Sequence, residues 1–412
     1  PAAPETRISI DDPEVIEFRR AIIEWMMANH PHDCPVCDEG GECHLQDMTV
    51  MVGHDYRRHR FPKRTHRNQN LGPLLNHEMN RCIQCYRCVR FYRDYAGGDD
   101  LAVMGWHDEV YFGRHADGTL ANEFSGNLVE ICPTGVFTDK TFRKHYSRKW
   151  DLQTSPSVCV HCGLGCNTIP AERYGVLRRI RNRYNHQVNG YFLCDRGRFG
   201  YDFVNSDRRI RLAVVREPSG ERPVGADESI RRAAGMLREG RAIGIGSPTA
   251  SLESNYALLR LVGAGNFYHG MPSNHLRDVR TMVDILRRGP AASASLAECD
   301  RCDAVVVLGE DVTNVAPMLA LSLRQAVLER PMAAARKRMK GLHSWQDVIV
   351  REAIQQAKGP LYVASADETK LDAPATMTFR LAGPDLARLG FAIAAAIDPD
   401  CPPVPDLPEN TR

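Results

Sequence analysis

Residues 79–90 read MNRCIQCYRCVR, and this stretch decides how the chain folds. Cys82, Cys85 and Cys88 follow one another with two residues between each pair, and Cys132-Pro133 lies further along the chain. Three thiolates on such short steps, together with a distal Cys-Pro, form the spacing that holds a [4Fe-4S] cluster. Zinc sites favour separate C-x2-C pairs. We therefore predict an iron–sulfur site here, although Cys132 can by spacing alone complete this site or another one.

Upstream of this motif lies a second group of potential ligands, with the spacing His30-x3-Cys34-x2-Cys37-x5-Cys43. Four ligands so close in the chain can complete one metal site. A Cys3His zinc site and an iron site are equally compatible with this stretch taken alone. His32, His44 and His54 are alternative candidates for the fourth ligand.

Downstream lies a third group, Cys159-x2-Cys162-x3-Cys166-x27-Cys194, followed by Asp195-Arg196-Gly197. A zinc ribbon is the alternative for such a set. The two neighbouring groups make iron the preferred interpretation.

The composition agrees with a multidomain protein whose first half holds the metal. The chain has 412 residues, 43% of them hydrophobic, and 11 of its 14 cysteines fall between Cys34 and Cys194. Clustered thiols in a long chain favour metal binding over disulfides. Cys299-x2-Cys302 has ligand spacing but lacks a partner pair, and we expect it to pack as small apolar residues.

Charge and hydropathy exclude several classes of protein. Lys and Arg number 53 against 51 Asp and Glu, so no global charge favours nucleic acid or an anionic membrane. No apolar run is long enough for a transmembrane helix, and no signal segment is present. The basic run 57–64, with His66 and Arg67, resembles a nucleic-acid patch. We prefer a role in offsetting cluster charge or contacting a neighbouring polypeptide, and a solvated basic face is the plainest alternative.

The remaining pattern predicts secondary structure. Asp12 followed by Pro13 starts a helix that should end near Asn29, and 30–150 should be loops organised around inorganic centres. After residue 206 we expect a parallel α/β sheet, with strands at 242–246, 304–308 and 361–363 and helices at 252–262, 318–328 and from 386. Gly244-x-Gly246 is better explained by tight strand-to-helix packing than by a phosphate loop.

Five stretches together carry a resemblance to a known family. They are HPHDCPVCDEGGECHLQDM (30–48), MNRCIQCYRCVR (79–90), EFSGNLVEICPTGVFTDK (123–140), CVHCGLGC (159–166) and FLCDRGRFG (192–200). Over nearly its whole length the chain resembles the family of NADH-quinone oxidoreductase G subunits. These are the large iron–sulfur subunits of bacterial respiratory complex I, similar to the mitochondrial 75 kDa protein.

The resemblance implies three [4Fe-4S] clusters. His30, Cys34, Cys37 and Cys43 would bind the first, and Cys82, Cys85, Cys88 and Cys132 the second. The third, on Cys159, Cys162, Cys166 and Cys194, resembles the cluster site of molybdopterin oxidoreductases and occurs in only some family members, with a structural or ancestral role.

The resemblance also implies a domain order. We expect 1–29 to be a helical linker from a missing [2Fe-2S] ferredoxin domain, and 30–150 an α+β His-Cys and ferredoxin-like domain with two clusters. A molybdopterin-oxidoreductase-type [4Fe-4S] domain follows at 151–206, and an incomplete α/β molybdopterin-like domain at 207–412. The [2Fe-2S] cluster belongs only to the missing N-terminal region. The expected molybdenum loop offers only Ser273, so neither molybdenum nor molybdopterin is expected.

The implied function is electron transfer within respiratory complex I. Electrons from NADH and flavin would pass one at a time toward quinone, coupled in the whole complex to proton translocation, with no bond-making site on this chain. The alternative is the iron–sulfur subunit of an NAD-linked hydrogenase or a formate dehydrogenase. Implied partners are the flavin subunit and the quinone-side iron–sulfur subunits, with no nucleic acid and no membrane insertion. The implied location is the cytoplasmic face of the bacterial inner membrane.

Overall fold

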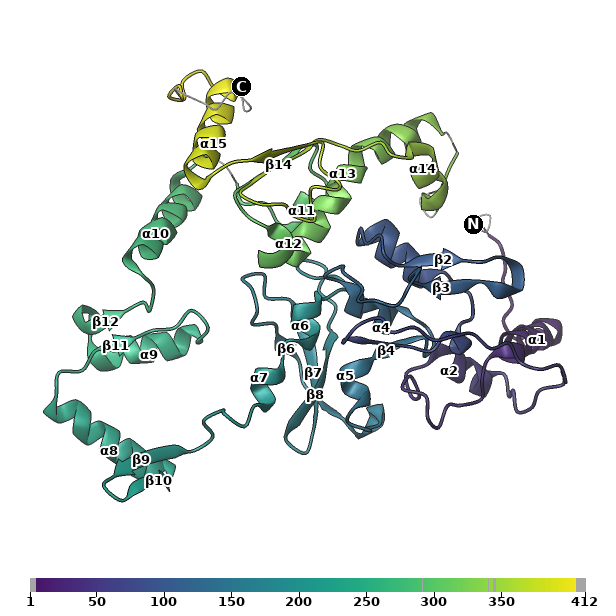
Figure 1. Cartoon of the computed structure of the whole chain (residues 1–412), viewed down its shortest axis with the longest axis horizontal. Helices are drawn as coiled ribbons and strands as arrows, with labels where there is room; N and C mark the ends of the chain where they lie inside the picture. The colour runs from purple at the N-terminus through teal and green to yellow at the C-terminus, as the bar shows by residue number, and fades with distance from the viewer. Residues whose placement is uncertain (1–4, 291, 340, 344–345, 405–412) are drawn as a thin grey trace. The chain divides into compact units, whose positions relative to one another are not determined.

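The computed structural model describes residues 5–290, 292–339, 341–343 and 346–404 (Figure 1). The chain divides into two compact units. One unit contains the residues up to Tyr201 together with those from Ser295 onward, and the other contains Asp202–Ala294. Residues 207–412, expected as one α/β domain, are therefore distributed over both units.

The first unit begins with the predicted helix, α1 (Pro13–Asn29). The Asp12 carboxylate accepts a hydrogen bond from the Glu14 backbone N–H at 2.9 Å and caps the helix. His30 ends it with extended backbone angles, immediately before Pro31. Ile23 and Met27 pack against Cys43 and Leu45, which stand at the start of α2 (His44–Met51). The predicted helix is confirmed, and its buried face anchors the first cysteine loop.

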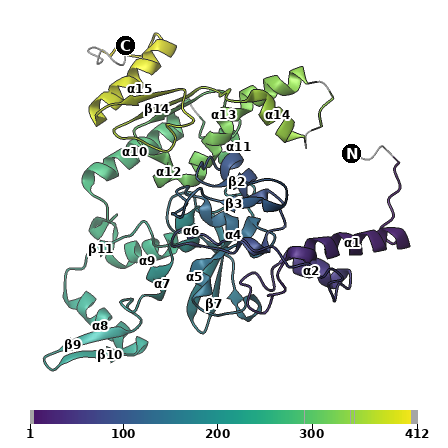
Figure 2. The same ribbon diagram turned by 45° about the vertical axis from the view of Figure 1, so that its right-hand side comes forward.

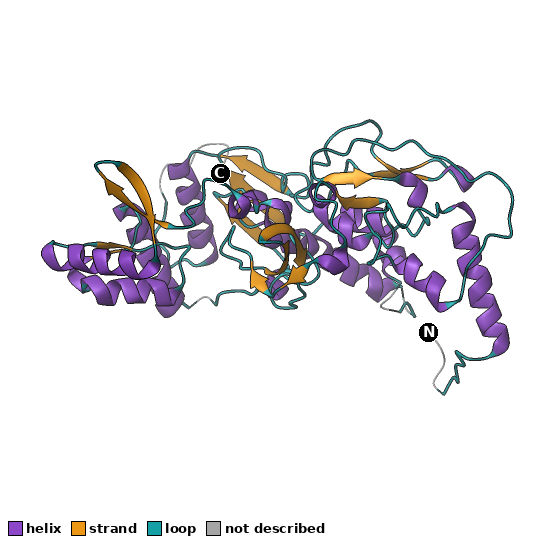
Figure 3. Ribbon diagram, turned by 90° about the horizontal axis from the view of Figure 1, so that it is seen from below, coloured by secondary structure: helices purple, strands orange, loops and turns teal. Residues whose placement is uncertain are grey.

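Short elements and long loops make up the next part of this unit, as Figure 3 shows by colour. Two antiparallel pairs form, β1 with β4 and β2 with β3. The strands are β1 (Leu75–His77), β2 (Ala102–Met104), β3 (Tyr111–Gly113) and β4 (Phe137–Asp139). The helices are α3 (Arg87–Val89), which continues into a π-helical turn (Arg90–Tyr95), α4 (Leu128–Ile131) and α5 (Lys140–Arg143). Single 3-10 turns occur at Met79–Arg81, His107–Glu109, Ser125–Asn127 and Lys149–Asp151.

An antiparallel sheet carries the third cysteine group. β7 (Asn167–Arg173) pairs with β8 (Val176–Asn182) along most of its length (Figure 1). It also pairs with β6 (Ser157–Val158) near its start and with β5 (Gln153–Thr154) near its end. Helix α6 (Asp195–Phe199) starts directly after Cys194 and packs on β8. Cys88 and Cys132 share one apolar core with Cys166 and Cys194. The second and third predicted sites are therefore built into the same packed core.

The segment from Ser295 adds a parallel sheet, β13-β14-β15, to the same unit. Its elements are α11 (Leu296–Cys299), β13 (Val305–Leu308), α12 (Val312–Val315), α13 (Pro317–Arg338), α14 (Asp347–Ile354), β14 (Leu361–Ser365), β15 (Met377–Arg380) and α15 (Gly383–Ile397). Met318 and Leu321 of α13 enter the shared core, and Figure 2 shows α13 beside α14. Two predicted strands and the helix from 386 are confirmed, while α13 extends ten residues beyond its predicted end.

The second unit has few strand contacts. A hairpin of β9 (Ala213–Glu217) and β10 (Gly220–Val224) is antiparallel, and only β11 (Gly244–Ile245) and β12 (Phe267–Tyr268) pair in parallel. The helices are α7 (Asp202–Asn205), α8 (Ala226–Glu239), α9 (Leu252–Val262) and α10 (Ser273–Arg288). Among the described residues the expected sheet after residue 206 is thus two separate parallel sheets and a hairpin. A Cβ at Gly244 would lie 2.9 Å from Val262 of α9, as tight strand-to-helix packing predicts.

Candidate metal centres

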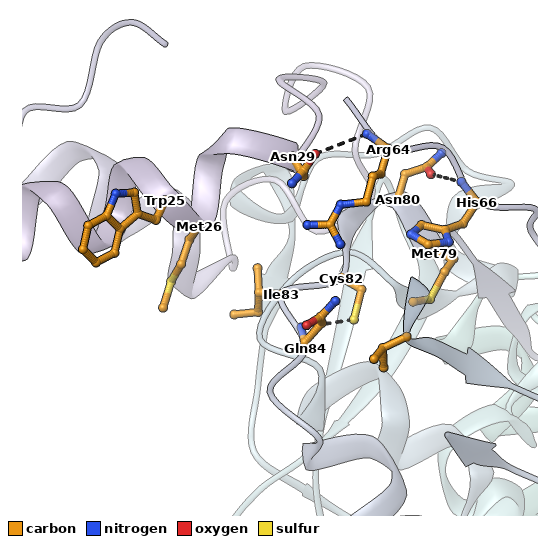
Figure 4. Close-up of a pocket in the computed structure, with 11 residues that line it drawn as sticks. Trp25, Met26, Asn29, Arg64, His66, Met79, Asn80, Cys82, Ile83 and Gln84 are labelled. Atoms are coloured by element: carbon orange, nitrogen blue, oxygen red, sulfur yellow. Dashed lines mark hydrogen bonds between the residues drawn. The ribbon is translucent and has the colours of Figure 1, made fainter. Parts of the chain in front are cut away.

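The Cys82 motif is shaped by two left-handed residues between its cysteines. Gln84 and Tyr86 have φ of +56° and +61°, which is costly for non-glycine residues and concentrates at functional sites. The Gln84 backbone N–H donates to Cys82 Sγ at 3.3 Å (Figure 4). Cys88 is buried and Cys85 is exposed. The motif therefore runs from the buried core at Cys88 to the surface at Cys85.

Cys132 completes this group from a distant part of the chain. It ends α4 before Pro133, and its sulfur lies 3.7 Å from the Thr134 hydroxyl. Burial raises the pKa of Cys132, and the backbone N–H groups of Phe137, Thr134 and Val136 oppose this rise. Nearby N–H groups favour the anionic form of a thiol. The Cys-Pro segment therefore offsets part of the effect of burial on this thiol.

The four thiols of this group lie near enough for their charges to act on one another. Burial raises the pKa of Cys82 to about 12, and Cys132 and Cys85 add to the rise. Burial likewise raises the pKa of Cys88, where the charges of Cys132, Cys82 and Cys85 also act. Four mutually repelling thiolates require a nearby positive centre to ionise. An iron cluster fits this requirement.

The third group converges in the same way. One small pocket is lined by all four cysteines, Cys159, Cys162, Cys166 and Cys194, together with Leu193, Pro317 and Met318. Burial raises the pKa of Cys166 to about 12, with Cys159, Cys194 and Cys162 adding to the effect. The Gly197 backbone N–H donates to Cys194 Sγ at 3.4 Å. A Cβ at Gly197 would lie 3.4 Å from Cys159 Sγ, so backbone approaches this pocket closely.

The first group surrounds the loop between α1 and α2. Cys43 caps α2, and its sulfur accepts from the Gln46 backbone N–H at 3.5 Å. Cys37 and Cys43 are buried, while Cys34 is half-buried. Burial raises the pKa of Cys43 to about 11, and Cys37 contributes to the rise. At least these two thiols of the first group therefore lie together.

His30 is the best-placed histidine for this site. Of the four candidates it alone is buried, with 7% exposure, whereas His54 is half-buried and His32 and His44 are exposed. Burial lowers the pKa of His30 to about 4 and keeps the imidazole neutral, the form that binds metals. In the described part of the chain its Nδ1 atom is buried without a hydrogen-bond partner. A buried nitrogen without a hydrogen bond is explained when it serves as a metal ligand.

Within the described residues, no group of three or more His, Cys, Asp or Glu side chains approaches closely enough to hold a metal ion. Structural zinc requires four donors at about 2.0–2.3 Å from one centre.

A buried ion-pair network between the sites was not anticipated from the sequence. Glu42, in the loop before Cys43, pairs with Lys149 at 3.0 Å, Arg179 at 2.7 Å and Arg181 at 2.7 Å. Burial alone would raise the pKa of Glu42, but these cations outweigh it and hold the pKa at about 2. Glu130, two residues before Cys132, pairs with the buried Arg198 at 2.7 Å. No spacing signal marks these residues, because their partners come from distant segments.

Several side chains of the basic run 57–67 form hydrogen bonds or ion pairs with other segments of this chain. Arg58 donates to Glu24 of α1 with Nε–Oε1 at 2.8 Å, and Arg67 pairs with Asp117 at 3.2 Å. Lys63 donates to the His30 carbonyl and lies 2.8 Å from His32 Nδ1. The run therefore fixes α1 and the start of the first cysteine loop, and it places a cation beside His30.

The other residues singled out in the sequence lie outside these groups. Cys299 and Cys302 are half-buried, and the Cys302 thiol donates to the Glu298 carbonyl at 3.5 Å. Ser273 begins α10 and is exposed. No helix in the described ranges combines the length and apolar character needed to cross a bilayer.

Three family models match the three groups in order. Residues 19–58 match an NADH-ubiquinone oxidoreductase-G iron-sulfur binding region, which contains the His30 group. Residues 72–138 match the ferredoxin-like domain of NADH-quinone oxidoreductase subunit 3, and residues 152–206 match a molybdopterin oxidoreductase Fe4S4 domain.

Curated relatives match along the whole chain. The G subunit of NADH-quinone oxidoreductase from Salmonella typhimurium is 56% identical over 415 residues, covering 100% of this chain and 45% of the relative. The Escherichia coli protein is 56% identical over 98% of this chain and 44% of its own length. The Shewanella oneidensis protein is 55% identical over 99% of this chain and 45% of its own length.

The chain belongs to the family of NADH-quinone oxidoreductase G subunits. It spans less than half the length of these relatives. A crystal structure of an NAD+-reducing [NiFe]-hydrogenase in the H2-reduced state is 27% identical over 32% of this chain and 57% of that chain, with a TM-score of 0.28. This score is too low to indicate a shared fold. The hydrogenase and formate dehydrogenase alternative is not favoured over the NADH-quinone oxidoreductase family.

Proposed function

We propose that this chain relays electrons from the NADH side to the quinone side of NADH-quinone oxidoreductase. It would do so with three [4Fe-4S] clusters. The observation that carries the proposal is the convergence of four thiols around Cys132 and of four more on one pocket at Cys194. The family models for iron–sulfur regions, which match residues 19–58 and 152–206, support the same interpretation.

The proposed ligands follow the three groups. The first set is His30, Cys34, Cys37 and Cys43; the second is Cys82, Cys85, Cys88 and Cys132; the third is Cys159, Cys162, Cys166 and Cys194. When bound, each cluster supplies a centre that gains and loses one electron.

The chain's own residues then determine the environment of each centre. The shared core, which includes Tyr92 and Phe124 at 0% exposure, excludes water around the second and third sites. Backbone N–H groups that donate to Cys82 and Cys194 stabilise the thiolate form. Hydrogen bonds to sulfur, burial and net charge are the features by which proteins adjust cluster potentials.

The finer assignments belong to the same proposal. Residues 1–29 serve as a linker, 30–150 as the two-cluster domain, 151–206 as the third-cluster domain, and 207–412 as a molybdopterin-like domain without molybdenum. The partners are the flavin subunit and the quinone-side iron–sulfur subunits. The location is the cytoplasmic face of the inner membrane, with coupling to proton translocation in the complete complex.

Replacing a buried ligand in the whole complex tests this function. Cys88→Ser is expected to abolish NADH-driven quinone reduction while NADH oxidation by an artificial acceptor at the flavin persists, because only the relay is broken. Cys302→Ser is the matched control, since Cys302 lies outside the three groups, and should change neither rate. Full quinone reduction by a Cys88→Ser complex would contradict the proposal.

A further inference from the structure

A buried cation, Arg81, lies where the first and second candidate sites meet. Arg81 directly precedes Cys82 and is 6% exposed. Its Nη2 and Nε atoms lie 2.7 Å and 3.1 Å from Asp33 Oδ2. Asp33 directly precedes Cys34. An ion pair with a buried arginine and a half-buried carboxylate therefore links the loop of the first site to the motif of the second.

The same arginine also contacts the segment that follows Cys132. Its Nη1 atom donates to the Gly135 carbonyl at 3.3 Å, and its own carbonyl accepts from the Thr134 hydroxyl at 2.8 Å. A Cβ added to Gly135 would lie 2.6 Å from Cys37 Sγ and 3.0 Å from Arg81 Cδ. The arginine side chain and the Cys37 thiol therefore pack against the same glycine.

Both charges of the ion pair stand beside the first site. The Arg81 side chain packs with the Cys37 thiol against Gly135. Asp33 stands in the chain between His30 and Cys34. The pair therefore brings one positive and one negative charge to the first site.

We propose that the Arg81–Asp33 pair positions the first site against the second and sets the midpoint potential of the first cluster. This rests on the proposed cluster at His30, Cys34, Cys37 and Cys43. Reduction adds negative charge to a cluster, so a nearby cation stabilises the reduced form and a nearby anion disfavours it. The Arg81 side chain is 7% exposed and its charge is poorly screened, whereas the Asp33 side chain, at 31%, is partly screened by solvent.

Two neutralising substitutions should move this potential in opposite directions. In the intact complex, Arg81→Met should lower the midpoint potential of the first cluster, because Asp33 is left unpaired. Asp33→Asn should raise it, because the cation is left unopposed. Arg81→Lys retains the charge and should stay nearer the native potential than Arg81→Met. The readout is a redox titration followed by low-temperature EPR, with the third cluster's signal as internal reference.

Arg143→Met supplies the matched control. Arg143 lies 3.5 Å from Asp38, in the same cysteine loop, but its side chain is 47% exposed, so solvent screens its charge. Arg143→Met should shift the midpoint potential of the first cluster less than Arg81→Met does. If the Arg81→Met complex loses the first cluster, the upward shift expected in Asp33→Asn tests whether the pair sets this potential.

Shifts of the same sign in Arg81→Met and Asp33→Asn, or no shift in Asp33→Asn, would overturn the inference. The unsubstituted complex separates this result from a failure of the proposed function. If that complex shows three cluster signals and the two variants leave the first cluster's potential unchanged, only the role of the ion pair is rejected. Absence of the first cluster's signal from the unsubstituted complex rejects the cluster assignment on which the inference rests.

Discussion

His30 is the residue on which the character of the first site depends. Its imidazole is neutral and buried, whereas the other ligands of this set are thiols. A neutral nitrogen in place of an anionic thiolate raises a cluster potential, as in Rieske centres. We therefore expect His30→Cys to lower the midpoint potential of the first cluster in an EPR-monitored redox titration. An unchanged potential in a variant that retains its iron would show that this ligand does not adjust the site.

Gly135 tests how closely the backbone approaches the first site. A Cβ here would lie 2.6 Å from Cys37 Sγ, a distance that real side chains do not adopt. Gly135→Ala should therefore reduce the iron bound per chain, because Cys37 must move from its ligand position. Gly163→Ala is the control, since nothing lies within 4 Å of its added Cβ. Equal iron contents in both variants would contradict the proposed position of Cys37.

Sequence reasoning predicted the candidate ligand residues but not the charges between them. Thiol spacing marked all the cysteine groups, and burial then separated His30 from His32, His44 and His54. Arg81 carries no such signal, because its partners Asp33 and Gly135 come from segments 48 and 54 residues away. Only the folded chain reveals that relation.

Elements with a local cause were predictable. The Asp12 cap and Pro13 specify the start of α1, and Pro31 limits its end. The hairpin of β9 and β10 was not predicted. Strand pairing depends on partners elsewhere in the chain, which is also why the expected sheet after residue 206 is divided.

Strand β1 contains a buried histidine that should make stability depend on pH. His77 is 2% exposed, its Nδ1 accepts from the Gln69 N–H at 3.1 Å, and its Nε2 faces the Phe112 carbonyl at 3.0 Å. Burial lowers its pKa to about 4. The folded pKa lies below the unfolded value of about 6.5, so this contribution is complete above pH 6.5 and is lost as pH falls toward 4.

The expected loss from His77 is about 2 kcal/mol between pH 7 and pH 5. Urea unfolding at both values should show His77→Gln losing less stability than the native chain, because glutamine can keep both hydrogen bonds without titrating. Equal losses in the two proteins would contradict the assignment of the pH dependence to His77.

Helix α13 joins the C-terminal sheet to the cluster-bearing part of the first unit. Arg324 pairs with Glu123 at 2.6 Å, with side chains 7% and 11% exposed. Removing one partner of a buried pair leaves an uncompensated charge and costs about 3–5 kcal/mol. Because Lys370 also lies 3.4 Å from Glu123, we expect Arg324→Met to lose less, about 2 kcal/mol.

Chemical denaturation measures the loss of unfolding free energy in Arg324→Met, and Arg388→Met is the control. Arg388 pairs with Asp385 at 3.2 Å on the exposed face of α15, where an ion pair contributes little. Equal stability of the two variants would show that the α13 contact does not hold the unit together.

At the scale of the whole molecule, the cysteine groups organise the first unit. Cys88, Cys132, Cys166 and Cys194 share one core, and the buried pairs of Glu42 and Glu130 connect all three predicted sites. The sequence predicted separate domains on either side of residue 150. It contained no local sign of this shared core, because the contacts that form it join distant segments such as Asn127 and Leu193.

The most direct test of the central claim is analysis of iron and acid-labile sulfide on the purified protein, together with low-temperature EPR after reduction. We predict about 12 irons and about 12 sulfides per chain, four of each for every [4Fe-4S] cluster, and three distinguishable signals. A colourless protein containing zinc without sulfide would contradict the account.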